Sequence, residues 1–157
     1  MSDNKPLSFD IGKIQLYQKN KYPLLFIDQI TETIPGKYAK AIKNFSFNEW
    51  FFPVRSDYSY SVPAFVLTES LEQTFLMTFL TLKEYASVTT STICMDNVVL
   101  KRSIFPGSTL EITATLDLFR RGIAKGHSVG YVDGNLAVSL DVTVAINSVL
   151  NKFKPKL

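Results

Sequence analysis

Apolar residues run almost without interruption over residues 64–82, and this pattern predicts one long helix that is apolar on nearly every side. Pro63 stands immediately before the segment, where proline favours the start of a helix. Such a helix has no face suited to water, so we expect it to be buried inside the fold. The segment is long enough to span a membrane, but Glu69 and Glu72 near its middle argue against a membrane span.

Segments on both sides of this helix have the character of β-strands. Residues 24–34 and 37–47 flank the turn signal Pro35-Gly36, so we expect them to pair antiparallel. Residues 109–121 alternate, and the apolar residues at every second position from Leu110 to Leu118 are predicted to share one face. Asp133-Gly134 lies between two further strand-like runs and predicts a tight hairpin.

These elements indicate a single α+β domain over residues 1–157, in which one antiparallel sheet wraps around one long central helix. A short helix is expected within residues 9–18, and residues 1–8 are expected to be a flexible N-terminus. One sheet leaves part of the helix and part of its own edge uncovered. We therefore expect a dimer, in which a partner covers them.

The composition of the chain limits which binding partners and which cellular compartment suit it. The net charge of +3 comes from scattered basic residues, which gives no indication of nucleic acid binding but suits an acidic protein partner. Cys94 is the only cysteine and His127 the only histidine, so the usual zinc ligand sets cannot be assembled, and we expect no metal or other cofactor. A single cysteine and an N-terminus without an apolar signal region favour a cytoplasmic protein.

Four stretches of the chain, taken in order, resemble one protein family. They are KYPLLFIDQITETIPGKYAKAIKNFSFNEWFF, VPAFVLTESLEQ, NVVLKRSIFPGSTLEI and FRRGIAKGHSVGYVDGNLAV. They are similar to the hotdog-fold beta-hydroxyacyl-acyl-carrier-protein dehydratases of bacterial fatty acid synthesis, and the resemblance covers about residues 10–147. It implies a double-hotdog dimer whose sheets join edge to edge, an acyl tunnel at each subunit interface, and acyl carrier protein as the partner that delivers substrate.

The resemblance also implies a mechanism and places its residues. In the family, a histidine before the central helix removes the C2 proton of the substrate, and a glutamate on the helix of the other subunit protonates the departing hydroxyl. That glutamate matches Glu69, and the glutamine one turn later matches Gln73. Pro63 and Ala64 stand at the helix start, where a backbone N–H would polarise the thioester carbonyl.

The family's histidine falls on Arg55, which cannot do the same work. Arginine stays protonated in proteins and has no lone pair that could accept a proton. Asp57 could replace the base, with Arg55 holding a carboxylate ionised, or Tyr58 or Tyr60 could act as an acid. The hypothesis that accounts best for the change is a heterodimer in which a histidine-bearing homologue completes the site around Glu69, since a homodimer would hold two incomplete sites.

Two other functions fit the same residues. A thioesterase of this fold would use Glu69 as base or nucleophile, and a non-catalytic protein would bind acyl chains or act as a scaffold. Glu72, on another face of the helix, is predicted to be a rim or structural residue, and His127 to lie on a strand surface. Basic residues resemble the rim on which the carrier docks in this family; they are Lys101, Arg102, Arg120, Arg121 and Lys125.

Overall fold

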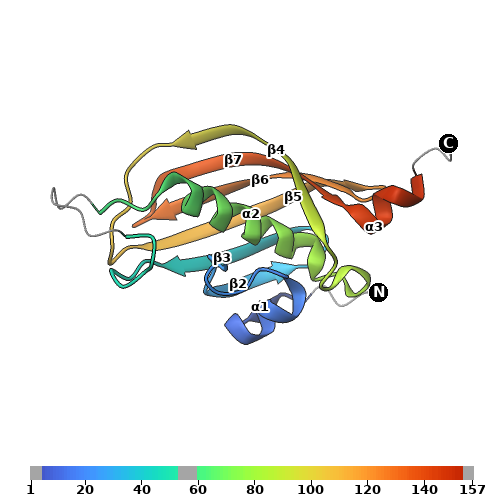
Figure 1. Ribbon diagram of the computed structural model, residues 1–157, viewed down its shortest axis with the longest axis horizontal. Helices are drawn as coiled ribbons and strands as arrows, with labels where there is room; N and C mark the ends of the chain where they lie inside the picture. The colour runs from blue at the N-terminus through green and yellow to red at the C-terminus, as the bar shows by residue number, and fades with distance from the viewer. Residues whose placement is uncertain (1–4, 53–59, 154–157) are drawn as a thin grey trace.

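The computed structural model describes residues 5–52 and 60–153. The long helix α2 (Ala64–Leu80) lies across one face of a seven-stranded sheet, which curves around it (Figure 1). Every residue from Ser70 to Leu80 is buried. The expected antiparallel sheet wrapped around one central helix is therefore confirmed.

The sheet is antiparallel throughout and has the strand order β1-β2-β3-β5-β6-β7-β4. Its strands are β1 (Leu7–Phe9), β2 (Gln29–Ile34), β3 (Tyr38–Asn44), β4 (Thr90–Leu100), β5 (Thr109–Arg120), β6 (Ile123–Val132) and β7 (Asn135–Ile146). The short helices are α1 (Ile11–Tyr17), η1 (Lys83–Tyr85), α3 (Asn147–Leu150) and η2 (Asn151–Phe153). β4 pairs only with β7, so it forms one edge of the described sheet.

Two strand predictions are confirmed by the backbone of their turns. Asp133 and Gly134 have φ angles of 50° and 72°, the left-handed pair that a two-residue type I′ hairpin requires. Gly36 has a φ of 78° and joins β2 to β3. Few residues other than glycine, asparagine and aspartate adopt positive φ angles without strain. The Asp-Gly and Pro-Gly pairs therefore predicted the positions of these turns correctly.

Three boundaries differ from the sequence prediction. Leu7 and part of the N-terminus form the edge strand β1 instead of fraying. The strand β2 begins at Gln29 rather than at residue 24, because the preceding segment gives its backbone groups to a side chain of α2. In β5 the register shifts between Leu116 and Leu118, so Leu118 turns outward and is 47% exposed.

Glycine lets the sheet come close to the central helix at Gly126. A Cβ at this position would stand 2.0 Å from the carbonyl oxygen of Thr115 and 2.5 Å from Cε2 of Phe75, a fully buried residue of α2. Neither neighbour can move far, since one is sheet backbone and the other fills the core. The absence of a side chain thus sets the distance between β6 and α2.

We expect Gly126→Ala to lower the free energy of unfolding by about 1–3 kcal/mol through overpacking. Gly12→Ala is the matched control, because the new methyl group would meet nothing closer than 3.4 Å and alanine favours the helix α1. Urea unfolding of both variants measures the difference. Equal stability of the two variants would contradict the close approach.

Candidate functional site

The carboxylate of Glu69 is held on the middle of α2 by two amide side chains. Oε1 of Glu69 accepts a hydrogen bond of 2.7 Å from Nε2 of Gln73, one turn later on the same helix. It accepts a second, of 3.2 Å, from Nδ2 of Asn20 in the segment between α1 and β2. Both donors contact the same oxygen, Oε1, and a carboxyl group can accept these bonds at Oε1 whether or not Oε2 carries a proton. Glu69 remains half-buried, so the carboxylate is fixed without being sealed.

Gln73 connects the carboxylate of Glu69 to the backbone of the segment before β2. Its side chain is fully buried; Oε1 accepts from the backbone N–H of Phe26 at 2.8 Å, and Nε2 donates to the carbonyl oxygen of Leu24 at 2.8 Å. Gln18 reaches the backbone of the same residue, donating from Nε2 to the carbonyl oxygen of Gln73 at 2.6 Å. The position of Glu69 therefore depends on segments about fifty residues away in sequence.

Glu72 is buried beside this site, not exposed at its rim. It is 7% exposed, and its carboxylate accepts a hydrogen bond from the hydroxyl of Thr92 on the edge strand β4. Burial raises the pKa of Glu72, the bond from Thr92 lowers it by a smaller amount, and the nearby Glu69 carboxylate raises it further. The sequence pattern missed this contact because Thr92 is 20 residues away and lies in a different element.

The start of α2 opens into a cavity of about 450 Å³. Pro63 is the N-cap, no side chain caps the helix, and Pro63 and Ala64 line this cavity, so the positive end of the helix dipole lies beside it. Lys101 and Arg102 line the same cavity together with Ala64. Two cations and a helix N-terminus favour a negatively charged or strongly polarised ligand here.

The other basic residues named from the sequence lie elsewhere in the chain. Arg120 and Arg121 line a cavity of about 200 Å³ near the opposite end of α2, where Phe119 stacks on Phe79. Lys125 lies on the outer face of the sheet, where it lines a hollow with aspartates of neighbouring strands. Within one chain the five residues therefore do not form a single basic rim.

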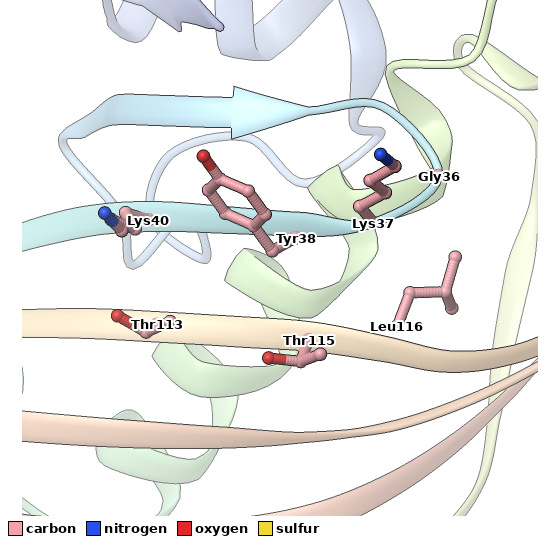
Figure 2. A pocket seen from close by; sticks show the side chains of 7 residues that line it. All are labelled: Gly36, Lys37, Tyr38, Lys40, Thr113, Thr115 and Leu116. Atoms are coloured by element: carbon pink, nitrogen blue, oxygen red, sulfur yellow. The ribbon is translucent and has the colours of Figure 1, made fainter. Parts of the chain in front are cut away.

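A hollow of about 460 Å³ on the outer face of β3 and β5 is separate from the candidate site (Figure 2). The side chains of Tyr38, Lys40, Thr113 and Thr115 point away from α2, which lies behind the strands, whereas Leu116 packs partly against the core. The hydroxyl of Tyr38 donates to Glu32, and Nζ of Lys40 lies 3.2 Å from the same carboxylate. These polar groups satisfy one another at the surface.

Arg55 and Asp57 lie outside the described residues. His127 is exposed on β6 as expected, and its Nδ1 lies 3.0 Å from Oδ2 of Asp117. Across residues 5–52 and 60–153, no group of three or more His, Cys, Asp or Glu residues is arranged to hold a metal ion. In the same ranges no helix has the length and apolar character needed to cross a membrane.

Comparison with known proteins gives a match over most of the chain. The model of the FabA-like domain matches residues 19–141. The chain belongs to the FabA-like domain family. It is 32% identical over 151 residues to the 3-hydroxyacyl-(acyl-carrier-protein) dehydratase FabZ of Burkholderia mallei (strain SAVP1), covering 94% of this chain and 97% of that relative. The FabZ of Oenococcus oeni is 31% identical over 134 residues, covering 85% of this chain and 96% of the relative.

Solved structures with the same fold are more distant in sequence. A chain of the dehydratase heterocomplex ApeI:P from Xenorhabdus doucetiae superposes with a TM-score of 0.73 at 14% identity, covering 91% of this chain and 97% of that one. The virulence protein Cj0977 of Campylobacter jejuni gives a TM-score of 0.62 at 12% identity, covering 82% and 80%. These likenesses support the hotdog fold expected for a FabA-like domain.

Gln73→Leu should lower the free energy of unfolding by about 2–4 kcal/mol, because it leaves the N–H of Phe26 and the carbonyl of Leu24 without their partner. Gln29→Leu, the same substitution at an exposed position of β2, is expected to change stability by less than about 0.5 kcal/mol. Urea unfolding compares the two. Similar losses of stability in both variants would show that the hydrogen bonds of the buried Gln73 amide do not stabilise the fold.

The buried carboxyl of Glu72 should make stability depend on pH. Its folded-state pKa is raised above 4.5, so its contribution is most favourable below pH 4.5 and is lost as pH rises through the folded-state pKa. Glu72→Gln removes this dependence, and the variant should gain stability relative to the unmodified chain as pH increases from about 4 to about 8. Unfolding curves across this range measure the gain, and a constant difference would contradict it.

Proposed function

We propose that this chain is a subunit of a 3-hydroxyacyl-acyl-carrier-protein dehydratase and supplies the acid Glu69 to a site completed by a histidine-bearing homologue. The observation that carries the proposal is the carboxylate of Glu69, fixed by Gln73 and Asn20 yet still reachable, in a chain whose position for the base is Arg55. Similarity to FabZ supports the reaction, and the likeness in fold to a chain of the dehydratase heterocomplex ApeI:P supports a complex of two different chains.

The reaction removes water from a 3-hydroxyacyl thioester. The partner histidine takes the C2 proton, and the electrons of that bond form the C2–C3 double bond while the C3–O bond breaks. Glu69 gives its proton to the departing oxygen. Arg55 cannot replace the histidine because a guanidinium has no basic lone pair, so in this proposal another chain brings the base.

The start of α2 supports substrate binding in the same subunit. The backbone N–H of Ala64, at the start of α2 beside the cavity, suits the carbonyl oxygen of the thioester, where negative charge increases during proton abstraction. Lys101 and Arg102 beside the same cavity suit an acidic carrier protein that delivers the thioester. The thioester and the carrier would thus approach α2 from its N-terminal end.

The test is enoyl formation from 3-hydroxybutyryl carrier thioester by the purified chain alone and with its co-purifying homologue. Loss of a general base costs about 10²–10⁴ in rate, so we expect the complex to exceed the chain alone by a factor in that range. Glu69→Gln in this chain should abolish the gain, whereas Gln29→Leu should leave it unchanged. Equal rates with and without the homologue would overturn complementation, and release of free thiol would indicate a thioesterase.

A further inference from the structure

The side chain of Gln73 has one N–H left to offer Glu69, and the backbone decides this. Its Oε1 accepts from the backbone N–H of Phe26 at 2.8 Å, and Nε2 donates one hydrogen to the carbonyl oxygen of Leu24 at 2.8 Å. A flipped amide would set N–H against N–H and C=O against C=O, so these partners fix the orientation of the amide. The second hydrogen of Nε2 is donated to Oε1 of Glu69, 2.7 Å away.

Asn20 donates to the same oxygen of Glu69 from a different segment. Its Nδ2 lies 3.2 Å from Oε1, although the two residues are 49 positions apart in the sequence. A carboxyl oxygen that accepts from two N–H donors has both of its lone pairs in use, so it has no site left for a proton. In the neutral form of Glu69 the proton therefore belongs on the other oxygen, Oε2.

We propose that Glu69 acts as an acid through Oε2 alone, and that Asn20 and Gln73 are positioning residues that keep the proton on this oxygen. This inference rests on the proposed dehydratase function. The C3–O bond of the substrate breaks with its electron pair on oxygen, and that oxygen takes the proton from Oε2. The carboxylate that remains keeps both N–H donors at Oε1, where they stabilise the new negative charge. Both amides act through Glu69.

Asn20 is the better of the two amides for an experiment. Gln73 also binds the backbone of Leu24 and Phe26, so its substitution affects folding as well as the carboxyl group. Asn20 is half-buried, and its hydrogen bond to Glu69 joins two side chains. Substitutions of Asn20 therefore change the surroundings of Oε1 with less effect on the fold.

The first experiment tests the proton-bearing oxygen in the isolated chain. Glutamine has the shape of a protonated glutamate, with an acceptor oxygen on one side and a donor on the other. In Glu69→Gln the carbonyl oxygen should therefore take the place of Oε1, and the side-chain amides of Asn20 and Gln73 should keep their hydrogen-bonded chemical shifts in NMR spectra. Glu69→Leu should move the Asn20 resonance towards that of an exposed amide.

The control for these spectra is Glu84→Leu, at an exposed carboxyl in η1, which should leave both amide resonances in place. Asn20 and Gln73 resonances that move as far in Glu69→Gln as in Glu69→Leu would overturn the proposal. The measurement needs neither substrate nor partner, so it remains decisive if the proposed dehydratase function fails.

The second experiment compares two substitutions of Asn20 in the complex with the co-purifying homologue. Asn20→Ala removes one donor and leaves that of Gln73, so kcat for enoyl formation should fall by about threefold to tenfold. Asn20→Asp keeps the shape of the side chain but places an acceptor against Oε1, which draws the proton of Glu69 to that oxygen. This variant should lower kcat by about 100-fold, as expected when a general acid is impaired, and should leave KM unchanged.

The order of the two losses separates positioning from packing. If Asn20 only filled space, Asn20→Ala would be the more damaging variant, because aspartate has nearly the size of asparagine. That order, or an unchanged kcat in Asn20→Asp, would overturn the proposal and leave the dehydratase function standing. Asn151→Ala and Asn151→Asp, at an exposed position of η2, are the matched controls and should keep the normal rate. An unmodified complex that forms no enoyl product would instead contradict the proposed function.

Discussion

The central helix is buried from Ser70 to Leu80, so each polar side chain there must find a hydrogen-bond partner, either in the surrounding structure or in the helix backbone. Gln73 binds the backbone of Leu24 and Phe26, and Glu72 binds Thr92. Ser70 instead donates to the carbonyl oxygen of Val66 within the helix. This requirement decides how the chain before β2 and the edge strand β4 sit against α2. A purely apolar helix would pack at the same depth but would leave its rotation and its neighbours less strictly specified.

The same requirement creates an asymmetric pair of carboxyl groups. Two acids one turn apart on an exposed helix would share one environment and would both ionise. Here Glu69 receives amide donors from Gln73 and Asn20 and stays half-buried, whereas Glu72 is buried and accepts from the hydroxyl of Thr92 on β4. Burial raises the pKa of Glu72 above that of an ordinary carboxyl. The two carboxyl groups, three residues apart on one helix, are therefore positioned by different parts of the fold, one by the chain before β2 and the other by β4.

The sequence predicted the architecture well because its strongest signals are local. An uninterrupted apolar run, alternating strands and an Asp-Gly turn each follow from nearby residues. The family resemblance placed Glu69 and Gln73 together, and the structure shows their side chains 2.7 Å apart. The contacts of Asn20 and Thr92 with the two carboxyl groups could not be predicted, because they join elements 49 and 20 residues apart. The outward turn of Leu118 was missed because a bulge interrupts an otherwise regular alternation.

The exposed side of the candidate site carries apolar residues that a second chain would cover. Phe65 is half-exposed one turn before Glu69, and Ile93 is 54% exposed on the edge strand that holds Glu72. A second chain placed over these residues would remove apolar surface from water and pair with the free edge of β4. It would approach the same face of α2 from which Glu69 is reachable. Under the proposed function, the contact that buries this surface also brings the histidine that the chain lacks. A subunit that cannot abstract a proton by itself would then be active only when its hydrophobic edge is covered.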